Sequence, residues 1–184
     1  MHAVRSRPEL VDAIRAGARP KYLFFWNQNA PGGSVHKGCL SQWYPSPFTA
    51  DGHVFATAEH YMMWRKAVLF DDLDTAARIL AAKHPRQAKD LGREVRGFDQ
   101  ETWDAQRFAI VADGSALKFG ADPDLRDYLL ATGDRVLVEA SPLDRVWGIG
   151  LTEDDPRATD PEQWQGLNLL GFALAEARSR LRPA

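Results

Sequence analysis

The longest segment with helical periodicity in this chain, residues 99–120, carries apolar side chains on two faces instead of one. One stripe consists of Phe108, Ala112, Ala116 and Phe119, and the other of Trp103, Ile110 and Leu117. A surface helix needs a single apolar stripe, so two stripes predict a helix that other elements cover on both sides. The fold of this chain has to be built around that helix.

Shorter helices are expected on both sides of this segment, because proline and glycine bound further apolar-periodic stretches. These helices are expected at residues 7–17, 59–70, 72–84, 85–95, 123–132 and from about 169 onward. Thr57 stands where an N-cap of the second helix belongs, and Pro85 ends the third. The chain is therefore predicted to be mostly helical.

Extended segments are few and short. The apolar stretches 21–28 and 135–140 predict strands, and a turn at Asp51–Gly52 predicts a hairpin within residues 38–57. Residues 29–38 and 141–166 are expected to be irregular, and irregular stretches as long as the second are more often functional than idle. Without regular strand–helix alternation, the fold class is predicted to be α+β, mostly helical around a small antiparallel or mixed sheet.

Length and composition favour one soluble domain. The chain has 184 residues, of which 45% are hydrophobic and 26% charged, which suits a single compact domain at 23–184 preceded by a helical lead-in at 1–22. A formal net charge of −2 gives no electrostatic footprint for extended nucleic acid or an anionic membrane. A single cysteine, Cys39, and the lack of an apolar leader predict a cytoplasmic protein.

Several common sites are not indicated by the sequence. The five histidines are scattered, so no metal site is expected, and no cofactor is implied. The stretch "WGIGL" lacks the third glycine of a dinucleotide fingerprint, and "GGSVHKG" lacks the Gly-Lys-Ser/Thr of a phosphate loop. Cys39 is expected to be a packed residue instead of a nucleophile.

What remains is a set of ionised groups beside large aromatic side chains. Glu59 and Lys66 stand about two helical turns apart on one face of an otherwise apolar helix. Trp103 and Arg107 lie one turn apart on the long helix, and Asp144 precedes "VWG" in the irregular stretch. Paired carboxylates with aromatic walls suit cleavage of a glycosidic bond, where one group handles the leaving-group proton and another stabilises positive charge at the sugar carbon.

The chain also resembles a known family in four segments, which run in order over nearly its whole length. They are "TAEHYMMWRKAVLFDD", "PRQAKDLGREVRGFDQETWDAQR", "LKFGADPDLRDYLLATGDRVLVEASPLDRVWGIGL" and "WQGLNLLGFAL". Together these segments are similar to the NADAR family, which includes the YbiA-like N-glycosidases. The resemblance implies a YbiA-like fold and hydrolysis of the C1′–N bond of a ribosylated amine.

The resemblance assigns roles to individual residues. It implies catalytic roles for Glu59, Lys66 and Asp144. It also implies substrate contacts at Trp103, at Trp147 and Gly148 of the "D..WG" element, and at Asn168 of the "G.N.LG" element; Arg107 joins them because it lies one turn from Trp103.

Each of these residues also has a structural interpretation. Glu59 would complement a helix dipole, Lys66 would reach from an apolar face to water, Asp144 would bond its own turn, and Asn168 would cap the last helix. The tryptophans would belong to the core.

Three functions follow from the resemblance. The first is an N-glycosidase acting on a phosphorylated ribosylamino-pyrimidine intermediate of riboflavin biosynthesis. The second is a hydrolase that removes ADP-ribose from modified guanine bases, and the third is a non-catalytic module that binds ADP-ribose or a nucleotide. In the catalytic cases the expected partner is a small-molecule ribosyl-amine or ADP-ribosylated substrate, and Lys66 either forms a Schiff base with the sugar or assists the carboxylates.

Overall fold

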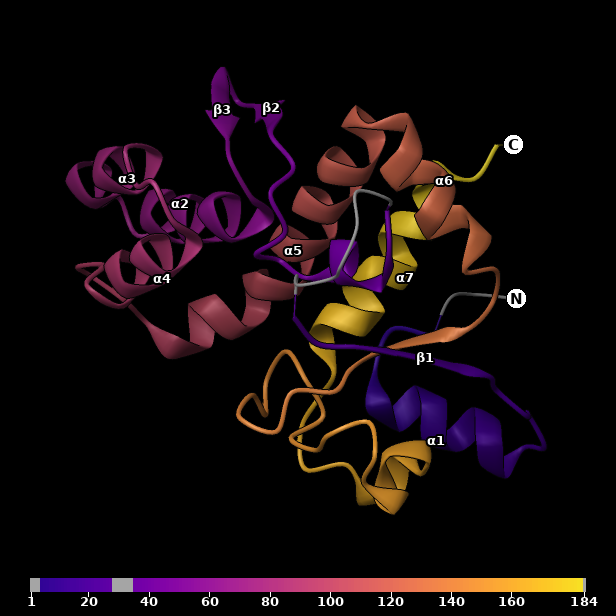
Figure 1. Ribbon diagram of the computed structural model, residues 1–184. Helices are drawn as coiled ribbons and strands as arrows, with labels where there is room; N and C mark the ends of the chain where they lie inside the picture. Colours follow the sequence, from indigo (N-terminus) through magenta and orange to yellow (C-terminus); the bar gives the residue numbers. More distant parts are fainter. Residues whose placement is uncertain (1–3, 28–34, 184) are drawn as a thin grey trace. The chain divides into compact units, whose positions relative to one another are not determined.

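A computed structural model of the chain describes residues 4–27 and 35–183. The chain divides into two compact units, one formed by residues 1–41 and 124–184 and the other by residues 42–123. Figure 1 labels the helices and strands of both units. Most of the loop expected at residues 29–38 falls on residues 28–34, which lie outside the described residues.

The unit formed by residues 42–123 holds a hairpin and four helices. Strands β2 (Phe48–Ala50) and β3 (His53–Phe55) pair antiparallel around the turn at Asp51 and Gly52, which confirms the predicted hairpin. The helices are α2 (Ala58–Leu69), α3 (Leu73–Leu80), α4 (Pro85–Arg93) and α5 (Gln100–Ala121). In Figure 1 helices α2, α3 and α4 lie side by side, and each of them packs against the other two.

Local capping sets the starts of these helices. The Thr57 side chain accepts the amide of His60 at the start of α2, as predicted, and the Asp72 and Asp99 carboxylates do the same for α3 and α5. At α4 the cap is the imidazole of His84, directly before Pro85. Each cap satisfies an amide that the first helical turn leaves without a backbone partner.

Helix α5 differs in part from the two-stripe prediction. Trp103, Ile110 and Phe119 are buried, but Leu117 is 38% exposed and Lys118 is buried in its place. The reason is a close approach of α2 at Gly114, where an added Cβ would lie 2.6 Å from the Tyr61 ring. A glycine that faces a tyrosine ring therefore forms this contact, and the apolar pattern of α5 alone does not mark it.

The other unit is built on two strands. Strands β1 (Tyr22–Phe25) and β4 (Val136–Glu139) pair in parallel, with Tyr22 opposite Val136 and Phe25 opposite Glu139. Helices α1 (Arg7–Arg15) and α7 (Leu169–Leu181) lie on opposite faces of this pair (Figure 1). The remaining elements are α6 (Pro123–Ala131) and the short 3₁₀ helices η1 (Lys37–Leu40), η2 (Pro156–Thr159) and η3 (Pro161–Gln163).

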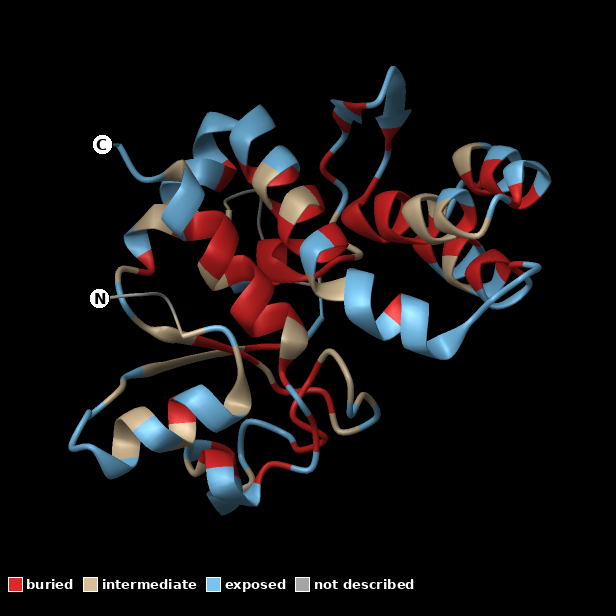
Figure 2. Ribbon diagram, turned by 180° about the vertical axis from the view of Figure 1, so that it is seen from behind, coloured by how far each residue is buried: buried red, intermediate tan, exposed pale blue. Residues whose placement is uncertain are grey.

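Helix α7 contributes a long run of buried residues to this unit. Buried residues follow almost its whole length (Figure 2). It approaches β4 so closely that a Cβ on Gly171 would overlap the carbonyl oxygen of Leu137. Glycine is therefore required at this crossing.

The α+β class, mostly helical, is confirmed. The described strands form two separate pairs, one parallel and one antiparallel. In the part of the chain that the structure describes, no helix combines the length and the apolar character that a membrane crossing needs.

Candidate active site

Glu59 lies in the first turn of α2 and is only 3% exposed. Its amide donates to the carbonyl of Gln42 at 3.0 Å, which fixes the start of the helix against the segment before the hairpin. A carboxylate here is favoured by the helix dipole, as the structural interpretation requires. A surface carboxylate would give the same dipole benefit without the cost of leaving water, so burial sets Glu59 apart from an ordinary helix-capping acid.

Lys66 lies two turns further along α2, and its amino group is enclosed by aromatic rings. Nζ lies 4.2 Å from the ring centroid of Phe98 and 5.6 Å from that of Trp103. It donates one hydrogen bond, 2.8 Å long, to the carbonyl oxygen of Gly92. Burial lowers the pKa of the Lys66 amine below its usual 10.5, since the charged form loses hydration.

A close contact between helices places the acceptor for Lys66. Gly92 lies on α4, and a Cβ there would overlap the sulfur of Met63 on α2. Without a side chain at Gly92, α4 comes near enough for its carbonyl to reach the Lys66 amine. Met63, on the other side of this contact, thus helps to define the surroundings of the lysine.

Helix α5 supplies the two further predicted residues of this unit. Trp103 is 7% exposed and forms part of the aromatic enclosure of Lys66. Arg107, one turn later, forms a 2.6 Å ion pair with the Asp104 carboxylate and is mostly buried. The structure therefore brings Lys66 and Trp103 together, and it places Arg107 one helical turn from the indole.

Two residues of this region were missed by sequence reasoning. Phe98 stands in the turn between α4 and α5, 41% exposed and in edge contact with Phe70. Lys118 on α5 is 1% exposed, with Nζ 5.6 Å from the ring centroid of Tyr44. The only sequence signal for Phe98 is a large aromatic residue directly after Gly97, and a lysine inside an apolar helical stripe is the signal for Lys118.

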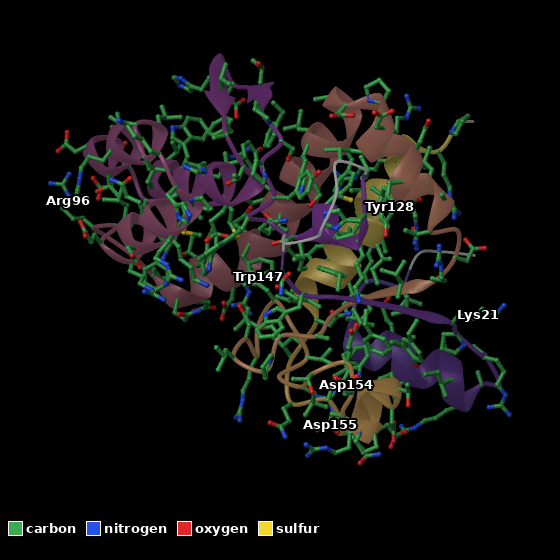
Figure 3. All side chains as sticks on the ribbon, viewed as in Figure 1. Lys21, Arg96, Tyr128, Trp147, Asp154 and Asp155 are labelled. Carbon is green, nitrogen blue, oxygen red and sulfur yellow. The ribbon has the colours of Figure 1, made fainter. Side chains whose placement is uncertain are left out.

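The unit with β4 holds the remaining predicted residues in the loop that follows this strand, where Figure 3 labels Trp147. The Asp144 Oδ1 atom accepts the amides of Val146 at 2.8 Å and of Trp147 at 2.7 Å. These bonds hold the loop in a tight turn and leave the second carboxylate oxygen to other contacts. Asp144 therefore forms the turn, and it has a carboxylate oxygen to spare for chemistry.

The loop also serves as the N-terminal cap of α7. The amides of Asn168, Leu169 and Leu170 donate to carbonyl oxygens at Gly148, Val146 and Trp147, over 3.1–3.2 Å. These are amides that a helix start leaves without partners. The loop is thus fixed to a buried helix.

Asn168 is fully buried at the N-cap position of α7, in the left-handed region with φ +55°. Its side chain does not cap the helix. Its amide nitrogen donates to the Leu137 carbonyl at 2.9 Å, and its Oδ1 accepts the Glu139 amide at 3.0 Å. Asn168 therefore ties α7 to β4 beneath the loop.

Gly148 is a position of close approach. A Cβ there would lie 2.8 Å from the Glu139 carbonyl oxygen and 3.1 Å from that of Asp144. Gly166 is similar, because its Cβ would overlap the Gly148 carbonyl oxygen. The glycines of the "WG" and "QG" pairs let three backbone segments pack without side chains between them.

The described residues contain no group of three or more His, Cys, Asp or Glu side chains arranged to hold a metal ion. The chemistry available to them is that of a partly desolvated amine, buried or turn-fixed carboxylates and indole rings. Within the unit formed by residues 42–123, a partly desolvated amine and a buried carboxylate on one helix suit proton transfer and imine formation at a sugar carbon.

Comparisons with known proteins agree on one family. The NADAR domain family matches residues 24–182. N-glycosidase R617 of Acanthamoeba polyphaga mimivirus is 42% identical over 163 residues, covering 86% of this chain and 95% of the relative. Riboflavin biosynthesis protein VVA0006 of Vibrio vulnificus is 34% identical over 169 residues, covering 92% of this chain and 41% of that longer protein.

A solved structure has the same fold. The solution structure of Escherichia coli YbiA matches with a TM-score of 0.67 at 24% identity, over 89% of this chain and 86% of YbiA. At this identity the likeness concerns the fold alone.

Proposed function

Because this chain belongs to the NADAR family, we propose that it is an N-glycosidase, which hydrolyses the C1′–N bond between a ribose and an amine. The observation that carries the proposal is the setting of Lys66. Its amine is half-buried, lies between Phe98 and Trp103, and has a lowered pKa. A lysine with these properties loses its proton at a lower pH than an exposed lysine, which prepares it to act as a neutral nucleophile.

The first step uses the ring-opened form of the substrate. An N-ribosyl amine opens to an imine between C1′ and the amine nitrogen. The neutral Nζ of Lys66 adds to C1′, and the two protons of Nζ pass in turn to the departing nitrogen. The C1′–N bond then breaks, the free amine leaves, and C1′ is held as a Schiff base on Lys66.

The second step regenerates the free amine of Lys66. Water adds to C1′ of the Schiff base, its two protons pass in turn to Nζ, and the C1′–Nζ bond breaks to release the sugar as its aldehyde. The balance is one water consumed, with one amine and one ribose derivative formed. The Gly92 carbonyl holds one N–H of Lys66 and so orients the amine between the rings.

Glu59 is proposed to move the protons that both steps require. Its burial at the start of α2, on the same helix as Lys66, keeps it from bulk water, which suits a group that passes protons to and from a substrate. An ionised Glu59 would raise the pKa of a nearby lysine, so a shuttle role fits better than a permanent charge. Asp144 is proposed to stabilise positive charge at C1′ with the carboxylate oxygen that does not hold its turn.

The substrate contacts are proposed from the aromatic and amide groups. Trp103 and Trp147 are each proposed to contact the substrate, Arg107 to contact a phosphate, and the Gly148 backbone to approach the ligand closely. Asn168 is proposed to act by holding the loop that carries Asp144 and Trp147. The substrate class is a phosphorylated ribosylamino-pyrimidine, which agrees with the riboflavin biosynthesis name of one relative.

A cytoplasmic location is part of the proposal. The single cysteine, Cys39, is fully buried and reduced, and a reducing compartment suits it. Small phosphorylated metabolites are available to an enzyme in that compartment.

The test is an assay of two substrates. The protein is incubated with a ribosylamino-pyrimidine 5′-phosphate and, separately, with ADP-ribosylated guanosine, and released sugar phosphate or ADP-ribose is followed by chromatography. Release from the first substrate, lowered in Glu59→Gln by about 10²–10⁴-fold, is expected. Release of ADP-ribose from the second substrate alone would show that the protein acts on ADP-ribosylated guanine and not on the pyrimidine. Binding of either substrate without release would show that the protein is a binding module.

A further inference from the structure

A hollow lies in the unit with β4, away from the loop that carries Asp144 and Trp147. It has a volume of about 320 Å³, which is within the size range of small-ligand pockets. It is lined by the start of β4 with the turn before it, one face of α7, and Val4. All of these belong to the same unit.

The sequence of α7 explains why the space is open. Gly171, Ala175 and Ser179 recur at four-residue intervals, so these small residues lie on one face of the helix. Phe172, Leu137 and Val136 supply apolar walls beside them. The helix–strand contact is filled at Gly171, where a Cβ would overlap the Leu137 carbonyl oxygen, so the hollow lies beside this crossing, along the small side chains of Ala175 and Ser179.

Arginine side chains gather at one end of this hollow. Arg135, Arg178 and Arg182 line it together with a single carboxylate, Asp134. Arg182 and Asp134 pair at 2.7 Å, both largely exposed. Two further guanidinium charges therefore face the hollow without a carboxylate to balance them.

Arg178 is the most informative residue of this group, because it is only 7% exposed. Its Nη1 donates to the Thr132 hydroxyl at 2.7 Å and to the Arg135 carbonyl at 3.1 Å. Within the described residues no carboxylate lies in ion-pairing distance of it. The direct hydrogen bonds of this buried guanidinium go to neutral acceptors, and the Asp134 carboxylate acts on it only from beyond ion-pairing distance. An anion in the hollow would add a countercharge in direct contact with it.

We propose that this hollow is a second binding site, which takes a small phosphate-bearing molecule with an apolar ring. The buried Arg178 contacts the phosphate from inside the hollow, and the exposed Arg182 contacts it from the opening. The ring lies along Gly171 and Ala175, between Phe172 and the β4 side chains. Fixed guanidinium groups suit a phosphate because they offer several N–H donors in one plane.

Lowered pKa values agree with this arrangement. Burial, assisted by the charges of Arg182 and Arg135, lowers the pKa of Arg178 to about 10. A bound dianion would reverse this shift, since an opposite charge favours the protonated form.

The test uses the whole protein and simple probes. Phenyl phosphate, inorganic phosphate and phenol are titrated separately by calorimetry, and binding is located by amide chemical shifts in α7. Phenyl phosphate is expected to bind, inorganic phosphate to bind more weakly and phenol not at all, with the largest shifts at Gly171, Ala175 and Ser179. If inorganic phosphate bound as tightly as phenyl phosphate, the apolar ring would not contribute to binding, and that part of the proposal would be wrong. Chemical-shift changes confined to elements other than α7 would overturn the site.

Three variants distinguish binding in the hollow from a general effect of positive charge on α7. Ala175→Leu fills the space and Arg182→Gln removes the rim charge, and each is expected to weaken phenyl phosphate by about tenfold or more. Arg180→Gln is the matched control, because it removes the same charge from α7 outside the hollow lining. These variants leave the bonds of Arg178 to Thr132 and Arg135 in place, so the fold is retained. Equal weakening by Arg180→Gln, or none by Ala175→Leu, would contradict the proposal.

Discussion

The amine of Lys66 lies 4.2 Å from the ring centroid of Phe98, a residue that stands in the turn between helices α4 and α5. This ring, with the indole of Trp103, limits the access of water to a group that would otherwise be fully hydrated. The relationship links an exposed turn residue to the protonation state of the proposed nucleophile.

Turnover is therefore expected to rise with pH through the pKa of Lys66, at a pH below 10.5. The sign follows from the chemistry, since only the neutral amine attacks C1′ and burial favours that form. In Phe98→Ala water reaches the amine, so the rising limb of the pH–rate profile should move to higher pH.

Phe98→Leu is the control for this shift. It keeps apolar cover but removes the aromatic ring, so the limb should stay near its original position if desolvation is the cause. If the rising limb of the pH–rate profile moves equally in Phe98→Ala and Phe98→Leu, the shift comes from loss of the aromatic ring and not from loss of apolar cover.

Asp144 carries two roles that substitution can separate. Asp144→Asn keeps an oxygen for the amides of Val146 and Trp147 but removes the negative charge. We expect an unchanged melting temperature and a turnover lower by about 10²-fold or more. Asp144→Ala should lower both quantities, whereas full activity of Asp144→Asn would leave the residue a turn former only.

Asn168 is expected to be a stability residue. Asn168→Ala leaves the Leu137 carbonyl and the Glu139 amide without their side-chain partners, and each buried group left so costs about 1–3 kcal/mol. Urea unfolding followed by circular dichroism measures the loss. Leu167→Ala, at the exposed neighbouring position, is the control and should change stability by no more than about 0.5 kcal/mol.

His60 makes the stability of the protein depend on pH. Burial lowers its pKa below 6.5, while its Nε2 bonds the Ala82 carbonyl and its Nδ1 bonds the Thr57 hydroxyl. Below pH 6.5 the unfolded chain binds a proton that the folded chain resists, so the free energy of unfolding should fall as pH is lowered from 6.5. His60→Gln should flatten this slope and the exposed His53→Gln should keep it; an identical slope in both variants would exclude His60.

The parts of the fold that sequence predicts are those set by local chemistry. The Thr57 cap and the turn at Asp51 and Gly52 depend on residues within a few positions of one another. The helix expected to run to residue 84 ends already at Leu80, and Pro85 begins the next helix. The class of the fold follows from them, because helices with few, short strands leave little choice of architecture.

Other features depend on contacts between distant segments. Leu117 is exposed and Lys118 buried because Tyr61 packs on Gly114, and no periodicity encodes that contact. Asn168 looks like a helix cap, yet it bonds a strand 29 residues away. Phe98 has no helical or strand pattern to mark it, so its place over Lys66 emerges only from the tertiary structure.

The central claim, a Schiff base on Lys66, is tested most directly by trapping. The protein is mixed with a ribosylamino-pyrimidine 5′-phosphate, sodium borohydride is added during turnover, and peptides are analysed by mass spectrometry. The account predicts a reduced sugar phosphate adduct on Lys66, absent from Lys66→Arg. Release of sugar phosphate at the normal rate with no adduct on Lys66 would contradict it.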